Sequence, residues 1–98
     1  MQLPMIHWNG TARKELVEQI GDVLHRLDDT ISAVRQATPH MRDYYPQRDP
    51  QAWHKAMEEH EDRLRRLQTL RSEYEQLGEA LMDLPGQGAP GRNAEVTR

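Results

Sequence analysis

Apolar residues recur every three or four positions over two long segments without an internal proline, and this periodicity constrains the fold most strongly. In the first segment the apolar positions are Leu16, Ile20, Val23, Leu27, Ile31 and Val34. In the second segment the same rhythm is kept by Trp53, Met57, His60, Leu64, Leu67, Leu70, Tyr74, Leu77, Leu81 and Leu84. Side chains spaced in this way share one face of an α-helix. The sequence therefore predicts two long amphipathic helices.

Proline and capping residues predict where these helices begin and end. Thr38 precedes Pro39, and a proline disfavours the helical conformation in the residue before it. Asp49 is a good N-cap, and Pro50 fits the first helical position, where its missing N–H group costs nothing. We therefore expect a leader at 1–10, helices at about 11–37 and 50–84, a loop at 38–49 and a flexible tail at 85–98.

The expected fold class is all-α, a long antiparallel two-helix hairpin. The 98 residues are 36% hydrophobic and 30% charged and include no phenylalanine, so a thick core is not expected. A lone hairpin of this size buries one face of each helix and is marginally stable. We therefore expect the hairpin to oligomerise, at least as a homodimer. The leader, QLPMIHW, could add a minor N-terminal strand, although Pro4 weakens that alternative.

Composition also narrows the class of protein. The formal net charge of -3 argues against binding to duplex nucleic acid, and no run approaches the roughly 18 apolar residues of a membrane span. The chain has no cysteine, which excludes disulfides and fits a reducing cytoplasm. No glycine-rich phosphate loop, nucleophile elbow or zinc-helix signature is present. We expect a cytoplasmic, non-enzymatic protein with no catalytic residues and no cofactor.

The segment between the helices, ATPHMRDYYPQRDP, is the most chemically varied part of the chain. Tyr44 and Tyr45 offer aromatic faces on which a base can stack, and Arg42 can pair with a phosphate. Asp43 and Gln47 can bond ribose hydroxyls or the edge of a base. These are the ingredients of a nucleotide site. In the alternative interpretation, the tyrosines cover the open end of the hairpin and Asp43 caps the loop or pairs with a neighbouring arginine.

A second candidate cluster is HWNGT, at the start of the first helix. Trp8 supplies an aromatic plane, Asn9 a side-chain amide, and Thr11 lies at a helix N-terminus, whose free N–H groups attract anions. The alternative is an N-cap preceded by a tryptophan anchor. In a hairpin this cluster and the loop lie at opposite ends of the first helix, roughly 40–50 Å apart. A site that combines them therefore needs a second copy of the chain.

The acidic run HKAMEEHEDRLRR raises the question of a metal site. His54 and Glu58 are one helical turn apart, as are Glu58 and Asp62, so a divalent cation is conceivable. The arginines that follow favour a solvated, ion-paired helix face instead. We expect no metal.

HWNGT before one long helix and PHMRDYYPQ before another together resemble small proteins carried by bacteriophages and prophages. The layout is similar to the first type of the Thoeris anti-defence sponge family, over about residues 7–82. Members of this family are helical with a small sheet contribution and oligomerise. They hold cyclic nucleotide-derived immune signals, including cyclic ADP-ribose isomers, between protomers without cleaving them. The resemblance implies that Asn9, Thr11, Arg42, Asp43 and Tyr44 contact the ligand.

Two hypotheses of function follow from these patterns. The first is a phage anti-defence sponge that sequesters a cyclic nucleotide at subunit interfaces in the cytoplasm of the host bacterial cell. Its expected ligand-binding residues are Trp8, Asn9, Thr11, Arg42, Asp43, Tyr44, Tyr45 and Gln47. The second is a helical-hairpin structural or protein-interaction module that uses its apolar stripe and has no small-molecule ligand.

Overall fold

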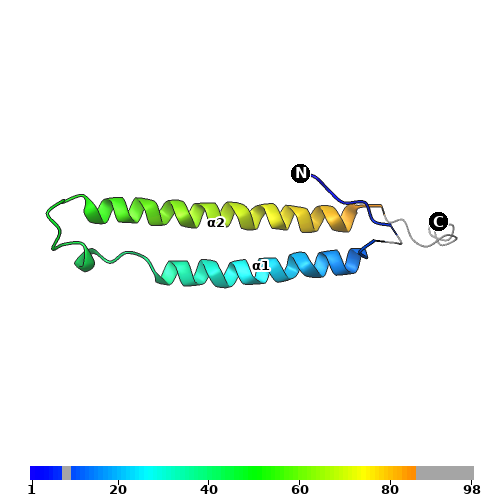
Figure 1. The fold of residues 1–98 in the computed structure, drawn as a ribbon, viewed down its shortest axis with the longest axis horizontal. Helices are drawn as coiled ribbons and strands as arrows, with labels where there is room; N and C mark the ends of the chain where they lie inside the picture. Colours follow the sequence, from blue (N-terminus) through cyan, green and yellow to red (C-terminus); the bar gives the residue numbers. More distant parts are fainter. Residues whose placement is uncertain (8–9, 86–98) are drawn as a thin grey trace. The chain divides into compact units, whose positions relative to one another are not determined.

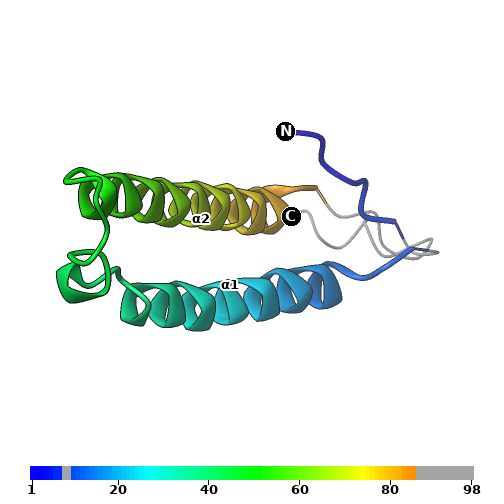
Figure 2. The same ribbon diagram turned by 60° about the vertical axis from the view of Figure 1, so that its left-hand side comes forward.

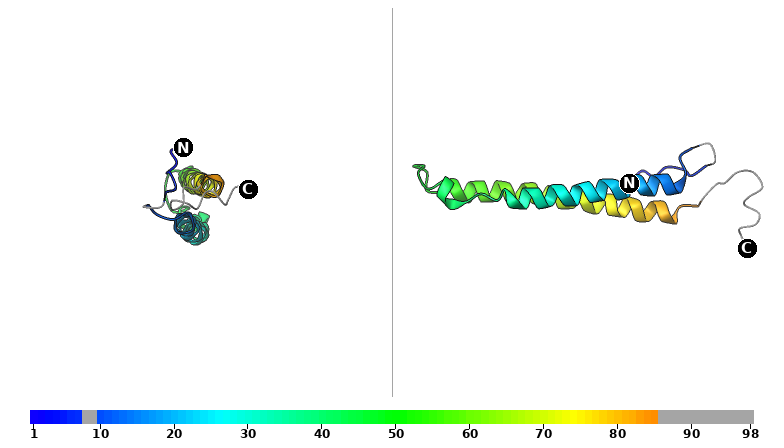
Figure 3. Two further views of the ribbon diagram at one scale, coloured as in Figure 1. Left: turned by 90° about the vertical axis from the view of Figure 1, so that its right-hand side faces the viewer. Right: turned by 90° about the horizontal axis from the view of Figure 1, so that it is seen from below.

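A computed structural model describes residues 1–7 and 10–85 of the chain, and two long helices make up most of this part (Figure 1). The elements are α1 (Arg13–Gln36), a short 3₁₀ helix η1 (Met41–Asp43) and α2 (Ala52–Asp83). The all-α prediction is confirmed. No strand occurs within the described ranges, and Ile6 in the leader makes an isolated β-bridge only. The right-hand view of Figure 3 shows both helices as continuous ribbons along their length.

Both ends of α1 agree with the sequence signals. Glu15 places a negative charge in the first turn and Arg35 a positive charge in the last. Both charges interact favourably with the helix dipole and stabilise the helix. Beyond the last turn, the Thr38 hydroxyl donates a hydrogen bond to the Arg35 carbonyl at 2.6 Å, and Pro39 prevents continuation. The helix begins at Arg13, two residues after the start expected from the sequence.

The start of α2 is fixed by Asp49. Its Oδ1 accepts a hydrogen bond from the Gln51 backbone N–H at 2.9 Å, and its carbonyl accepts one from Ala52 N–H at 3.1 Å. This is the geometry of an N-cap followed by proline at the first helical position, as the sequence predicted. The cap satisfies amide groups that the helix itself leaves without a partner.

The chain packs as two compact units, each of which contains a segment of both helices. The terminal unit consists of Met1–Leu24 with Glu73–Arg98, and the loop unit consists of His25–Ser72. In both units the helix segments run antiparallel, since residues farther along α1 contact residues nearer the start of α2. Arg13 and Ile20 contact Leu84 and Gly78 in the terminal unit, and Asp28 contacts Arg71 in the loop unit. This is the helical hairpin that the sequence predicted.

The described part of the terminal unit is held by close apolar packing. Leu81 is 2% exposed and is its most buried side chain, and Ile6 of the leader is buried as well. Gly78 on α2 lies against Ile20 on α1 so closely that an added Cβ would meet Ile20 Cγ2 at 3.3 Å. The Arg13 guanidinium donates to the Leu84 carbonyl, which ties the first turn of α1 to the end of α2.

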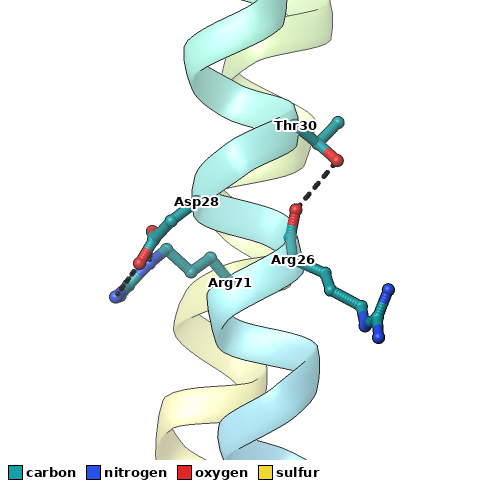
Figure 4. A network of polar contacts seen from close by, with 4 residues as sticks. All are labelled: Arg26, Asp28, Thr30 and Arg71. Carbon is teal, nitrogen blue, oxygen red and sulfur yellow. Dashed lines mark hydrogen bonds and ion pairs between the residues drawn. The ribbon is translucent and has the colours of Figure 1, made fainter.

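The loop unit is held by polar contacts between its helix segments as well as by Ile31, which is buried. Arg71 on α2 donates two hydrogen bonds to the carboxylate of Asp28 on α1, Nε to Oδ1 at 2.6 Å and Nη2 to Oδ2 at 3.3 Å (Figure 4). This bidentate geometry is favourable for an arginine–carboxylate pair. The hydrogen bond from Arg71 holds the pKa of Asp28 below its ordinary value.

His60 lies within the apolar stripe of α2 and is 5% exposed. Its Nε2 is 3.1 Å from the Thr38 hydroxyl oxygen. Because that hydroxyl donates its hydrogen to the Arg35 carbonyl, it accepts from His60, so we assign the imidazole proton to Nε2. A polar residue at a stripe position is thereby explained by a partner on the other side of the hairpin.

The core is shallow throughout the described residues. The buried apolar side chains there are Ile6, Ile31 and Leu81. The other apolar positions of the stripes are half-buried, except Leu70, which is 40% exposed. In the part of the chain that the structure describes, neither helix offers an apolar segment that could span a membrane.

Candidate functional site

Figure 2 shows the backbone path of the segment between α1 and α2, residues 37–51, here called the loop. Hydrogen bonds within the loop order it. His40 caps η1, because its Nδ1 accepts from the Arg42 backbone N–H at 3.3 Å. The Met41 carbonyl then accepts from the N–H groups of both Tyr44 and Tyr45. A further turn forms where Gln47 N–H donates to the Tyr44 carbonyl at 3.0 Å. The loop therefore has a defined backbone that can position side chains.

Trp53, in the first turn of α2, joins that helix to the start of the loop. Its indole Nε1–H donates to the Pro39 carbonyl at 3.3 Å. The neighbouring His54 ring lies 5.1 Å from the indole, measured between ring centroids, and is tilted by 59°. The hydrogen bond satisfies the polar edge of the indole and leaves its faces for apolar contact.

A hollow of 210 Å³ opens between the loop and the first turn of α2. Its lining, which defines the loop hollow, consists of Met41, Tyr44, Tyr45, Gln47, Asp49, Pro50, Trp53 and His54. Drug-sized ligands occupy sites of about 300–1,000 Å³, so this volume suits one ring system rather than a whole dinucleotide. Tyr45 is 79% exposed and can stand over such a ring from the solvent side.

Three of the residues predicted to bind a ligand meet in the loop hollow: Tyr44, Tyr45 and Gln47. Arg42 and Asp43 belong to η1 in the same loop but do not line the hollow. Thr11 is exposed and belongs to the terminal unit, whereas the loop belongs to the loop unit. Trp8 and Asn9 lie outside the described residues.

Some of the charged side chains in and beside the loop hollow have a partner of opposite charge, and others do not have one among the described residues. Asp49 Oδ2 forms an ion pair with Lys55 Nζ at 3.0 Å, while its Oδ1 caps α2. The backbone hydrogen bond from Gln51, followed by that from Lys55, lowers the pKa of Asp49. The side chains of Arg42 and Arg48 are exposed and make no hydrogen bond or ion pair with another described residue. The cationic side chains of the loop are thus available to an anion, whereas its capping carboxylate is already engaged.

Sequence reasoning missed the contribution of α2 to the hollow. Trp53 was assigned to the apolar stripe and His54 to a conceivable metal pair, yet both line the hollow. A signal was present, because Pro50 at the first helical position puts both residues in the turn next to the loop. Their orientation toward the tyrosines depends on the path of the loop backbone, which local patterns do not specify.

The acidic side chains of α2 lie beside arginines of the same helix. Glu58, Glu59 and Asp62 line a surface hollow together with Arg63 and Arg66. Asp62 pairs with Arg65 at 3.2 Å and with Arg66 at 3.0 Å. Within the described ranges no group of three or more histidine or acidic side chains is placed to hold a metal ion. The acids face arginines, as the ion-paired interpretation of the run expects.

Comparison with protein-family models, with curated proteins and with solved structures finds no match to this chain. Function must therefore be argued from the loop and the helix faces themselves.

Proposed function

We propose that the protein is a non-enzymatic binding protein that captures a cyclic nucleotide or a cyclic ADP-ribose-type signal through its loop. The observation that carries this proposal is the convergence of Tyr44, Tyr45, Trp53 and His54 on one hollow of 210 Å³. Stacking of a base on an aromatic side chain contributes about 1–3 kcal/mol. A hollow of this size and lining suits the base of a nucleotide, with the sugar and phosphate left outside.

The polar groups at the hollow have roles that fit such a ligand. The Gln47 side-chain amide can donate to and accept from the edge of a base. Arg42 and Arg48 lie in the same loop, their guanidinium groups pair with no other residue that the structure describes, and each can bind a phosphate in bidentate fashion. Asp49 has both oxygens engaged, one with Gln51 and one with Lys55, so it is not a free general base.

The resemblance to the anti-defence sponges supplies the biological purpose in this proposal. A phage protein of this kind would sequester a host immune signal in the cytoplasm. In this proposal, Asn9 and Thr11 of another copy of the chain supply the second half of the site. Binding at a subunit interface is accordingly part of the proposal, and the loop hollow is the half that one chain supplies.

Calorimetry with cyclic dinucleotides, cyclic trinucleotides and cyclic ADP-ribose isomers tests the proposal. We expect one member of the panel to bind the wild-type protein. Tyr45→Ala should weaken that binding about tenfold, the equivalent of about 1.4 kcal/mol of lost stacking. Tyr45→Phe is the matched control and should bind like wild type, because it keeps the ring. Absence of binding across the panel at micromolar protein would exclude the proposed function.

A second candidate function, a protein-interaction module, is favoured by one observation on α2. Val34, Leu67 and Leu70 form the apolar part of a groove of 350 Å³ flanked by Arg63 and Arg66. An apolar groove beside charged residues is a common site for a helix of another protein. Purification of the protein with one stoichiometric protein partner and without a bound nucleotide would favour this alternative.

A further inference from the structure

One face of α2 combines an acidic region, a basic region and exposed apolar side chains. The acidic hollow contains Glu58, Glu59 and Asp62, and the apolar groove contains Leu67 and Leu70 with Val34 of α1. Arg63 and Arg66 line both, so the hollow and the groove are contiguous. We call this surface the α2 face. It lies entirely within the loop unit, and no residue of the loop hollow belongs to it.

Apolar side chains of the α2 face are left without cover in a single chain. Leu70 is 40% exposed, and Leu67 and Val34 are half-buried. Such exposure is costly for a chain whose described part buries only Ile6, Ile31 and Leu81 among its apolar residues. A partner that covers this face would add the apolar burial that the hairpin lacks.

The order of charges along α2 identifies the partner. The acids of the face come first in the sequence, at 58, 59 and 62, and its arginines follow at 63 and 66. A second α2 in the parallel sense would set acid against acid and arginine against arginine. A second α2 in the antiparallel sense would set each acidic region against an arginine of the other copy. The face is therefore complementary to itself.

We infer that the α2 face is the interface of a homodimer, in which two copies of α2 pair antiparallel about a two-fold axis between Asp62 and Arg63. Glu59 of each copy then lies level with Arg66 of the other, since both are the same number of residues from the axis. Leu70 lies level with Lys55 of the other copy and packs on its methylene stem. The Lys55 ammonium group pairs with Asp49 of its own chain at 3.0 Å.

The two kinds of contact have different effects in this dimer. Ion pairs at a surface add little affinity individually, but repulsion between like charges excludes wrong orientations. Leu67 lies level with Glu58 of the other copy, as Leu70 does with Lys55, so the methylene stems of these charged side chains cover the leucines, and the charges set the antiparallel sense. Each contact occurs twice, because the interface is the same patch on both copies. A single charge reversal therefore introduces two repulsive contacts.

Sedimentation equilibrium over a range of concentrations tests the inference directly. The wild-type protein should be a dimer, and Arg66→Glu should raise its dissociation constant at least about tenfold. Arg65→Glu is the matched control, because Arg65 also pairs with Asp62 but lines neither the hollow nor the groove. It should leave dimerisation unchanged. Circular dichroism verifies that both variants keep their helices.

Complementary charge reversals provide the sharper test. Glu59→Arg alone should also weaken the homodimer, whereas an equimolar mixture of the Glu59→Arg and Arg66→Glu variants should form a heterodimer of wild-type strength. A wild-type protein that is monomeric at about 100 μM overturns the inference, since that lies far above typical affinities of stable dimers. Equal effects of Arg66→Glu and Arg65→Glu on the dissociation constant also overturn the inference. So does a mixture of Glu59→Arg and Arg66→Glu that fails to form the heterodimer. The outcome does not depend on whether the loop binds a nucleotide.

Discussion

The loop unit is tied across its helix segments by hydrogen bonds between side chains, whereas the described part of the terminal unit combines apolar contact with the hydrogen bond from Arg13 to the Leu84 carbonyl. Asp28 with Arg71 and Thr38 with His60 are the polar ties of the first. The apolar contacts of the terminal unit include the buried Leu81 and the close approach of Gly78 to Ile20. Apolar contacts respond to changes of volume and polar ones to loss of a partner. Substitutions of different chemistry should therefore affect the two units differently.

The largest effect is expected at the apolar centre of the terminal unit. Leu81→Ala removes the most buried side chain of the described residues, and should lower the free energy of unfolding by about 2–4 kcal/mol through lost burial and a residual cavity. Urea denaturation followed by circular dichroism measures the change. Met82→Ala is the control: its side chain is 64% exposed, and the loss should stay below about 0.5 kcal/mol. Similar losses in both variants would contradict the packing described for this unit.

The next largest effect is expected at the polar tie of the loop unit. Thr38→Val keeps the shape of the side chain but leaves the buried Nε2–H group of His60 without its acceptor, and should cost about 1–2 kcal/mol. Thr30→Val is the matched control, because it removes only an exposed hydroxyl bond to the Arg26 carbonyl (Figure 4). Adding His60→Leu to Thr38→Val should recover part of the loss. A purely additive double variant would show that the two side chains are not coupled.

Two glycines test how closely the helices of the terminal unit approach. Gly21→Ala should raise the free energy of unfolding by about 0.5–1 kcal/mol, because alanine favours the helix and an added Cβ meets no atom within 4 Å. Gly78→Ala brings the same gain in helix propensity, but its Cβ presses on Ile20 Cγ2. It should be the less stable of the two variants in thermal unfolding. Equal stabilisation would mean that the helices are farther apart at Gly78.

The smallest effect on stability is expected from Asp28, the exposed carboxylate that pairs with Arg71 in the loop unit. The pKa of Asp28 is lowered from 3.8 by the hydrogen bond from Arg71, so the folded state binds a proton less readily than the unfolded state. The pair therefore stabilises the fold above pH 3.8, and this contribution is lost as the pH falls through the lower folded-state pKa.

Asp28→Asn should accordingly reduce the loss of stability between pH 7 and pH 3, measured by urea denaturation at each pH. Glu79→Gln is the control, because Glu79 makes no hydrogen bond or ion pair with another described residue. In Glu79→Gln the loss of stability between pH 7 and pH 3 should be closer to that of the wild-type protein. A larger effect of Glu79→Gln than of Asp28→Asn would contradict the role assigned to the pair.

The helices were predictable because their signals are local. The stripe from Leu16 to Val34, the Thr38-Pro39 stop and the Asp49-Pro50 start each act within a few residues of the backbone that they specify. The observed bounds, Arg13–Gln36 and Ala52–Asp83, fall within one or two residues of those expected.

The candidate site was predictable only in part, because it depends on contacts distant in sequence. Tyr44, Tyr45 and Gln47 were identified from residue type alone, and they share a hollow. Trp53 joins them through its hydrogen bond to Pro39, which no periodic pattern shows. His60 was recognised as a stripe position, but the reason for a histidine there is Thr38, on the other side of the loop. Self-association and ligand binding stay predictions.

The contact between His60 and Thr38 has a consequence for the register of the two helices. A repeating apolar stripe looks much the same after a slip of about seven residues, two helical turns, so apolar packing alone selects among registers weakly. Such a slip in one direction would set Trp53 level with Thr38 and bury the imidazole level with Ile31, without an acceptor. It would also separate Arg71 from Asp28. The polar pairs of the loop unit thus make one alignment of the hairpin distinguishable from its near repeats.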